Sequence, residues 1–221
     1  MWCADEAGSI KHMNSFFSIL LGTSNTEKLQ ALSLLLHGLP LNLLSPEDLE
    51  SRVGPDENGG THHGNASLKA QYWSIQCDGL AIASDGGLVI PSAFGTWSSL
   101  YTNRIFADIK AKERPSALLE LLDRYQITDR RAFWIEAVAI ALKGDLVATW
   151  VARSSMGEIA HTVNEQVPVS GFWVNTVWYF SDLGKYYGSL SSEEIAISPD
   201  HWSVLHSEVR VFFEKYLINM G

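Results

Sequence analysis

The sequence has little cysteine, no long apolar run and no excess of basic residues, and each absence excludes a class of protein. Its 221 residues include only Cys3 and Cys77, too few for a disulfide framework or a thiolate metal site. This usage is typical of a reducing compartment, so we predict a cytoplasmic protein. The longest apolar stretches, 16–21 and 31–36, are far shorter than the roughly 18 residues that span a membrane, so we expect no membrane contact.

The charge balance limits the possible ligands. Sixteen basic residues against twenty-five acidic ones give a net charge of −9, and such a surface repels phosphate polymers. We therefore expect no binding to polymeric nucleic acid. A small phosphorylated ligand is compatible with this charge, because one basic pocket or helix N-terminus can bind an anion locally.

The length and composition indicate a globular chain. Hydrophobic residues make up 46% and charged residues 19%, which excludes a long disordered or collagen-like chain. Residues 1–12 are polar and acidic and lack the basic segment of a signal peptide. We predict a flexible leader over 1–12 and one domain over 13–221.

Hydrophobic periodicity predicts strands alternating with helices. The helix predicted after the first strand has a possible cap at Ser24 or Asn25 and ends at Gly38. The chain-order prediction is a strand at 16–22, a helix to 37, a strand at 41–44, a mobile loop at 45–60, a helix at 65–76, a tight bend at 84–87 between extended segments, a helix at 116–125, a hairpin at 132–142 and 146–153, and a final helix capped by Ser198 and Pro199.

The turn after the first strand combines the features of a phosphate site. Thr23, Ser24 and Asn25 precede a helix that carries Lys28 in its first turn. Unpaired backbone amides and the helix dipole attract an anion there, and Lys28 adds a positive charge. The alternative is that Asn25 merely caps the helix and Lys28 is solvated.

Four further groups of polar residues stand out in the sequence, and three of them each allow two interpretations. Asp85, in the segment Ser84-Asp-Gly-Gly, is either a turn residue or a metal ligand and general base. Asn65 and Lys69 share one helix face, at which they either bind a ligand or contact solvent. His62 and His63 do not suggest a metal site, because adjacent side chains point in different directions. Glu136, within an apolar strand, is either solvent-exposed or buried with a partner.

Three motifs in register make the chain resemble the inosine triphosphate pyrophosphatase family of house-cleaning nucleoside triphosphate pyrophosphatases. Family members carry a T-x-N-x-x-K-like turn, then T-F-x-E-N-A-x-x-K-A, then A-D-D-S-G-L. The matching segments here are residues 22–29, 61–70 and 81–88. Residues 95–101 are similar to the family's P-G-x-x-S-A-R-Y, and residues 171–175 to its G-F-G-Y-D.

The resemblance implies an α/β fold: an elongated, two-lobed molecule around a long mixed β-sheet with flanking helices, which forms a homodimer. It also implies hydrolysis of a nucleoside triphosphate to the monophosphate and pyrophosphate with Mg²⁺ or Mn²⁺. The implied roles are catalysis and metal binding by Asp85, phosphate binding by Thr23, Ser24, Asn25, Lys28 and Lys69, and support by Asn65 and Gly87.

The sequence departs from the family pattern at several functional positions. Gly64 and Ser84 stand where the family has acids, Leu100 replaces an Arg, and Asn175 replaces an Asp. The family's His-Arg pair, which holds the purine, is replaced by Pro199 and Asp200. These changes leave Asp85 as the one metal ligand of the family's set, unless Asp56, Glu57 or His63 moves in.

We therefore expect a divergent nucleoside triphosphate pyrophosphatase-like hydrolase, with a nucleotide as its small-molecule partner. Trp173, Trp178 or Trp202 could then stack on the base. The alternative is a catalytically degenerate nucleotide sensor, or a dimeric interaction module, with the same fold.

Overall fold

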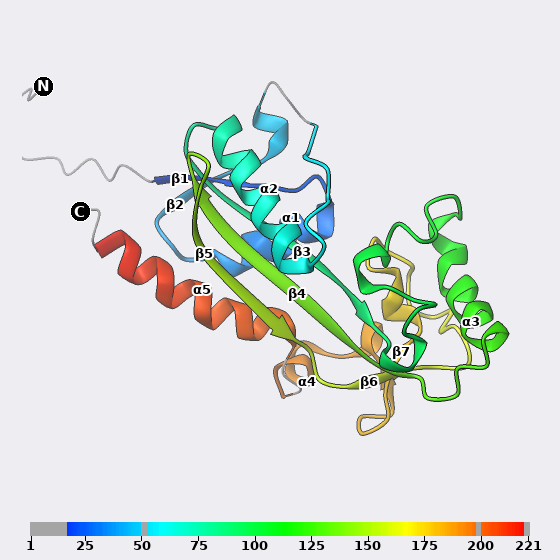
Figure 1. Ribbon diagram of the computed structural model, residues 1–221. Helices are drawn as coiled ribbons and strands as arrows, with labels where there is room; N and C mark the ends of the chain where they lie inside the picture. The colour runs from blue at the N-terminus through cyan, green and yellow to red at the C-terminus, as the bar shows by residue number, and fades with distance from the viewer. Residues whose placement is uncertain (1–16, 50–52, 198–199, 219–221) are drawn as a thin grey trace, which may run out of the picture.

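The computed structural model describes residues 17–49, 53–197 and 200–218. Strands and helices alternate along the first half of the chain, and a long sheet runs through the molecule (Figure 1). The predicted leader at 1–12 and the predicted cap at Ser198 and Pro199 lie outside the described residues.

The sheet is mixed and its strand order is β2-β1-β3-β4, followed by β6-β7-β8, with β5 beside β4. Parallel pairing joins β1 to β2 and to β3, whereas β4 pairs antiparallel with β3, β5 and β6. The strands are β1 (Phe17–Leu21), β2 (Leu41–Leu44), β3 (Leu80–Val89), β4 (Arg131–Leu142), β5 (Asp145–Arg153), β6 (Gly157–Ile159), β7 (Trp178–Phe180) and β8 (Lys185–Tyr186). The long β4 therefore connects the two parts of the sheet.

Five helices flank the sheet: α1 (Thr26–Leu35), α2 (His62–Gln76), α3 (Arg114–Arg124), α4 (Ser192–Ile197) and α5 (His201–Ile218). Leucines of α1 and the apolar stripe of α5 pack on the sheet face that carries Ile82 and Val138. Alanines of α2 pack on the opposite face, against Ala83 and Ala137. Because side chains alternate along a strand, Asp85 lies on the α2 face and Glu136 on the α1 and α5 face.

A second apolar core lies at the far end of β3 and β4. It joins β6, β7 and α3 to buried aromatic residues, among them Trp97, Trp134, Trp173 and Trp178. Trp173 and Trp178 are almost completely buried, so neither can stack on a bound base. That part of the sequence-based prediction is wrong for these two residues.

The structure also corrects the predicted bend at residues 84–87. These residues lie inside the continuous strand β3, paired in register with β4. Glycine occupies 86 and 87 because neighbouring groups approach the backbone there: a Cβ on Gly86 would collide with the Glu136 carboxylate, and one on Gly87 with the Ser99 carbonyl. Glycine here marks close packing instead of a turn.

The remaining predicted elements are close to those observed. The hairpin, the strand at 41–44 and the helices at 26–35 and 114–124 lie where periodicity placed them. The second helix begins earlier than predicted, at His62, because the Thr61 side chain caps it by accepting from the Gly64 backbone. Cys77 is an unpaired thiol at the end of that helix.

Among the described residues, no helix combines the length and apolar character needed to cross a membrane.

Candidate active site

The candidate site lies where β1 stops pairing with β3. The ladder between them ends at Leu21 and Ile82, and the backbone of Gly22 closes it with a 2.7 Å hydrogen bond to the Ile82 carbonyl. The chain then turns into α1 while β3 continues. A polar cavity of about 390 Å³ lies in this region, lined by Thr23, Ser24, Asn25, Lys28, Pro55, Asp56, Glu57, Lys69, Asp85, Gly86, Leu100, Thr102, Asn103 and Arg104.

The turn before α1 presents the helix N-terminus to this cavity. Asn25 Oδ1 accepts from the backbone amides of Glu27 at 2.9 Å and Lys28 at 3.2 Å, and therefore caps the helix. Thr23 Oγ1 accepts from the Asn25 amide at 3.1 Å. Asn25 is thus a cap and also a cavity residue, and its Nδ2 group is the part left to donate to an anion.

Asp85 is a mostly buried residue of the cavity lining and has several polar partners. Its Oδ2 lies 2.6 Å from His62 Nδ1 and accepts from Asn65 Nδ2 at 3.3 Å, whereas Oδ1 accepts from Lys69 Nζ at 3.0 Å. Burial raises the pKa of Asp85, but the His62 hydrogen bond and the charges of Lys69 and Lys28 outweigh it and hold that pKa well below its usual range. Asp85 is therefore an anion at neutral pH.

Lys69 joins Asp85 to the loop before α2. Its Nζ lies 2.7 Å from Glu57 Oε1 and 3.0 Å from Asp85 Oδ1, and Arg104 contacts Glu57 Oε2 at 2.7 Å. Burial lowers the pKa of Lys69, yet the two carboxylates raise it above its ordinary value overall. Two acids and two cations therefore alternate across the cavity wall.

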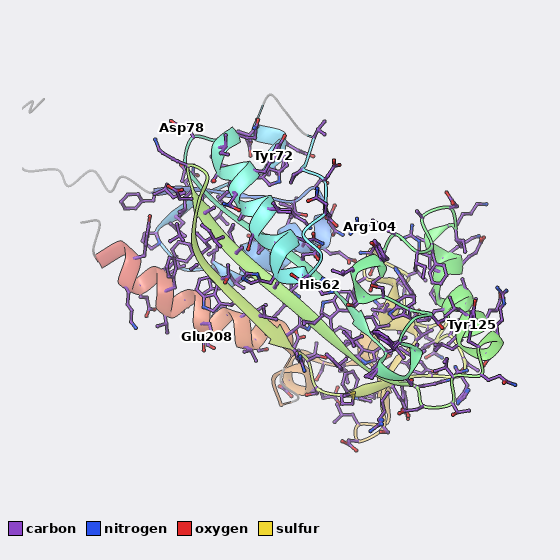
Figure 2. The ribbon with its side chains drawn as sticks, in the orientation of Figure 1. His62, Tyr72, Asp78, Arg104, Tyr125 and Glu208 are labelled. Atoms are coloured by element: carbon purple, nitrogen blue, oxygen red, sulfur yellow. The ribbon has the colours of Figure 1, made fainter. Side chains whose placement is uncertain are left out.

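His62 extends this network away from the cavity. Its Nδ1 faces Asp85 and its Nε2 lies 2.9 Å from Ser99 Oγ. Figure 2 shows His62 at the start of α2 and Arg104 on the segment after β3. The neighbouring His63 is exposed and its Nε2 lies 3.0 Å from Thr149 Oγ1, so the two histidines point apart as predicted and His63 does not approach Asp85.

Glu136 lies on the opposite sheet face and is fully buried with partners. Its Oε1 forms a 3.2 Å ion pair with Lys28 Nζ, and its Oε2 accepts from Trp134 Nε1 at 2.8 Å. Lys28 therefore has a buried counter-ion, which excludes the solvated alternative for its ammonium group.

A second cavity of about 280 Å³ adjoins the first and shares Asn25, Lys28 and Asn103 with it. Aromatic side chains line its inner wall. They are Trp134, Phe172, Tyr187, His201 and Trp202. Of the three tryptophans considered for base stacking, only Trp202 lines a cavity next to the cations.

The structure brings most of the sequence-predicted site residues to one place. Thr23, Ser24, Asn25, Lys28, Lys69 and Asp85 all line the polar cavity. Asn65 supports Asp85 and also accepts from the Gly59 amide at 2.8 Å. Gly87 lets the segment at 99–102 approach β3.

Sequence reasoning missed His62, Ser99 and Arg104 as members of this network and left Glu57 as one of three options. A His at position 62 could have been singled out, because it stands where the family motif has Phe. Ser99 and Arg104 belong to a short irregular segment whose folding onto β3 has no periodic signal.

The model of the Ham1 family matches residues 19–198, which is most of the chain. The chain belongs to the Ham1 family. Two curated relatives are a dITP/XTP pyrophosphatase of Thermoanaerobacter sp. (strain X514), 28% identical over 80% of this chain and 86% of the relative, and one of Dictyoglomus thermophilum, 28% identical over 90% and 95%. The solved structure of a HAM1 protein from Coxiella burnetii superposes with a TM-score of 0.76 at 23% identity, covering 90% of this chain and all of that one.

The structure gives a reason for one of the departures from the family motifs, Gly64, and locates three others. A side chain at Gly64 would collide with the carbonyl of Gly59, so this backbone has no space for a Glu. Ser84 is fully buried, and among the described residues its hydroxyl has no hydrogen-bond partner. Leu100 lines the polar cavity without a charge, and Asp200 is buried at the start of α5.

Proposed function

We propose that this Ham1 family member hydrolyses a nucleoside triphosphate to the monophosphate and pyrophosphate. The observation that carries the proposal is the polar cavity in which the α1 N-terminus, Lys28 and Lys69 surround the ionised Asp85. The pyrophosphatase names of the relatives supply the reaction class.

The triphosphate would be held by the turn and its neighbouring cations. The α1 N-terminus is capped on one side by Asn25 Oδ1, and an anion in the cavity meets its dipole and the Lys28 ammonium. Lys69 and Arg104 provide positive charge on the opposite wall. Each cation currently pairs with a protein carboxylate, so phosphate binding would exchange one anionic partner for another.

The acids of the cavity fit a divalent cation, and we propose Mg²⁺ or Mn²⁺. No cluster of three potential metal ligands exists among the described residues. However, Mg²⁺ commonly binds one or two carboxylates plus substrate phosphates. Asp85 and Glu57 supply two carboxylates that converge on the Lys69 ammonium, which marks a point where positive charge is stabilised. A bound cation would polarise the phosphate oxygens and neutralise their charge.

The adjoining aromatic cavity fits the nucleobase. It opens beside Lys28 and Asn25, so a triphosphate in the polar cavity leaves its nucleoside end near Phe172 and Trp202. Bases stack on aromatic side chains without needing a specific hydrogen-bond pattern. The choice of nucleobase would therefore depend on other residues than those that bind the phosphates.

The test is pyrophosphate release from a panel of nucleoside triphosphates with Mg²⁺ or Mn²⁺. We expect turnover by the wild-type protein and its loss in Asp85→Ala. The surface variant Asp78→Ala is the matched control, because its carboxylate is exposed and forms an ion pair with the surface residue Lys143. Turnover that is equal in wild type and Asp85→Ala would contradict the assignment.

A nucleotide sensor without catalysis is the second candidate, favoured by Gly64 and Ser84 at positions of family acids. Calorimetric binding of a nucleotide with no pyrophosphate release would support it over the enzyme. An interaction module would show neither. Homodimer formation and a cytoplasmic location stay predictions, and sedimentation of the purified protein tests the first.

A further inference from the structure

Asp85 belongs to the proposed pyrophosphatase site, and it also begins a continuous hydrogen-bonded chain through His62 to Ser99, two residues to which that reaction assigns no role. His62 Nδ1 lies 2.6 Å from Asp85 Oδ2, and His62 Nε2 lies 2.9 Å from Ser99 Oγ. His62 and Asp85 are both buried, whereas Ser99 is partly exposed. Each ring nitrogen thus faces the partner that it has in a serine-hydrolase triad.

The Asp85 carboxylate determines which atom is the donor in each hydrogen bond of this chain. Asp85 Oδ2 also accepts from Asn65 Nδ2 and Oδ1 accepts from Lys69 Nζ, so the carboxylate is the acceptor at each contact and His62 Nδ1 carries a hydrogen. In the neutral ring, Nε2 is then an acceptor, and the hydrogen bond at Nε2 must come from the Ser99 hydroxyl. This arrangement prepares Ser99 Oγ to lose its proton as it attacks an electrophile.

His62 and Ser99, which complete the chain, both differ from the residues that the family motifs have at these two positions. His62 stands at the Phe of T-F-x-E-N-A, and Ser99 at the Ala of P-G-x-x-S-A-R-Y. The side chains of Phe and Ala have no polar atoms, so they cannot form such a hydrogen-bonded chain to Asp85. The two changes are 37 positions apart in sequence and meet at one hydrogen bond.

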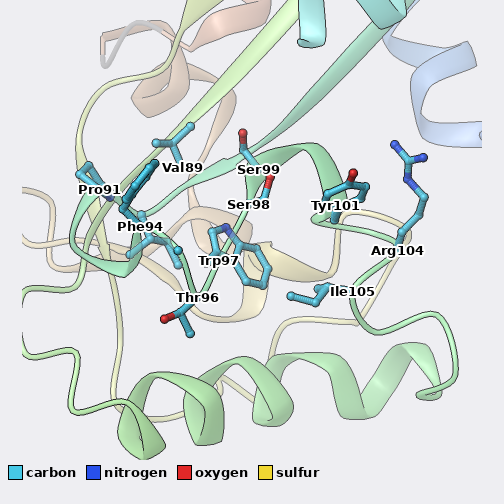
Figure 3. Close-up of a pocket in the computed structure, with 12 residues that line it drawn as sticks. Val89, Pro91, Phe94, Thr96, Trp97, Ser98, Ser99, Tyr101, Arg104 and Ile105 are labelled. Carbon is cyan, nitrogen blue, oxygen red and sulfur yellow. The ribbon is translucent and has the colours of Figure 1, made fainter. Parts of the chain in front are cut away.

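Ser99 also lines a large cavity that adjoins the phosphate cavity and shares Arg104 with it. This cavity has a volume of about 640 Å³ and its walls are mainly apolar, including Trp97, Phe94, Val89 and Ile105. Figure 3 shows Ser98 and Ser99 next to each other on its wall. The cavity can take an apolar group beside the Ser99 hydroxyl.

The division of the Asp85 oxygens keeps the two sites distinct. Oδ2 accepts from His62 and Asn65, and Oδ1 contacts Lys69 on the phosphate side. One carboxylate can therefore orient His62 through one oxygen while the other faces the polar cavity.

We infer that Ser99 is the nucleophile of a second hydrolytic site, which cleaves carboxylic esters with an apolar acyl group. Ser99 Oγ bonds to the acyl carbon while its proton passes to His62 Nε2, and the alcohol leaves with that proton. Water then attacks the acyl-Ser99 carbon and gives its proton to His62, which returns it to Ser99 Oγ as the carboxylic acid is released.

Two measurements on the full-length protein test the inference. The first is covalent labelling by a fluorophosphonate probe, mapped by mass spectrometry. The second is hydrolysis of p-nitrophenyl acetate, butyrate and octanoate. The variants are Ser99→Ala, which restores the family residue, His62→Phe, which also does so, and the matched control Ser98→Ala, which changes a serine of the same cavity wall.

We expect the label on Ser99 and ester hydrolysis that falls at least about 100-fold in Ser99→Ala and His62→Phe. Ser98→Ala should stay within about twofold of wild type, and butyrate or octanoate should exceed acetate. Equal labelling and hydrolysis in wild type and Ser99→Ala would overturn the inference, as would labelling at Ser98 alone. Ester hydrolysis and pyrophosphate release are assayed separately on the wild-type protein, so the failure of one activity is distinguishable from the failure of the other.

Discussion

At the scale of single residues, the charge of Asp85 depends on its surroundings. A carboxylate buried in this way would be destabilised by the loss of water, and it is kept ionised by donors on both of its oxygens and by nearby ammonium groups. An ionised, buried carboxylate next to cations is typical of functional sites, because hydrophobic cores seldom contain acidic residues.

Replacing Asp85 with Asn separates its charge from its shape. We expect pyrophosphate release to fall about 100-fold or more, the scale observed when one preorganised electrostatic group is removed. The unfolding free energy should fall by about 3 kcal/mol, because Lys69 loses a buried counter-ion. Steady-state kinetics and urea unfolding measure the two effects.

The pH dependence of that stability difference has a defined sign. The folded-state pKa of Asp85 is depressed, so its contribution is fully present above the unfolded value of about 3.9 and is lost as pH falls through the folded value. The difference between wild type and Asp85→Asn should therefore be constant from about pH 7 to 5 and shrink below about pH 4. A difference that grew on acidification would contradict the assignment of the charge.

The sequence predicts the residue types of the site better than their contacts. Asp85, Lys28 and Lys69 could be chosen from motif and spacing because each lies on a regular element. Glu136 was left undecided between solvent and burial, because its partner Lys28 is more than a hundred positions away in sequence. His62 was dismissed as a ligand, and only tertiary packing against Ser99 reveals its role.

At the scale of elements, the function of α1 depends on how it begins. Its N-terminus combines a side-chain cap with an open cavity, so one residue, Asn25, both stabilises the helix and lies at the proposed anion site. Asn25 Oδ1 satisfies amides of the first turn that would otherwise need another acceptor.

Asn25→Ala tests that shared role. Loss of the cap should cost about 1 kcal/mol, which lowers the melting temperature by roughly 2–4 °C for a chain of this size. Affinity for pyrophosphate should fall as well, measured by calorimetry. The matched control is Asn42→Ala, because the Asn42 side chain is exposed and donates to the exposed Ser18 hydroxyl. Equal effects of the two substitutions on melting temperature and pyrophosphate affinity would show that the Asn25 cap contributes to neither.

The strand β3 carries a different constraint at Gly86. A Cβ there would collide with the Glu136 carboxylate and lie 2.6 Å from the Ile135 carbonyl oxygen. We expect Gly86→Ala to destabilise the protein by about 1–3 kcal/mol and to weaken phosphate binding by displacing Glu136 from Lys28. Chemical denaturation measures the first effect.

Gly79→Ala is the control for that strand substitution, because its nearest neighbour, the Cys77 carbonyl oxygen, is at 3.5 Å, an ordinary contact. If both variants were equally stable, close packing would not explain why glycine occupies position 86.

The close packing at Gly86 and Gly87 also explains why the sequence-based prediction of a bend failed. Two adjacent glycines indicate either a turn or a close approach of neighbouring groups, and only the partner strand decides between them. Regular apolar periodicity, in contrast, located the hairpin and most helices.

At the scale of the whole molecule, charge is distributed unevenly. The chain carries −9 overall, yet Lys28, Lys69 and Arg104 gather at one cavity. This arrangement attracts a small anion at short range and disfavours a long phosphate polymer, which would have to lie along an acidic surface.

Two cavities meet at Lys28 and divide the proposed substrate between them. The polar cavity is built by the turn before α1, the first turn of α1, the loop before α2, α2, β3 and the segment at 100–104. The aromatic cavity shares the start of α1 and Asn103 with it and is otherwise formed by β4, the segment around Phe172, Tyr187 and the start of α5. Phosphate binding and base discrimination should therefore respond to different substitutions.

Trp202→Ala tests this division, because Trp202 lines only the aromatic cavity. Stacking on an aromatic side chain contributes about 1–3 kcal/mol per base, so kcat/KM for purine nucleoside triphosphates should fall roughly 10- to 100-fold. Cleavage of inorganic tripolyphosphate, which has no base, should stay within about twofold. Val204→Ala is the control, since Val204 is 40% exposed on the same helix and lines neither cavity. A parallel loss of nucleotide and tripolyphosphate cleavage would show that Trp202 supports the fold of the site and not the base, and the aromatic cavity would then need another occupant.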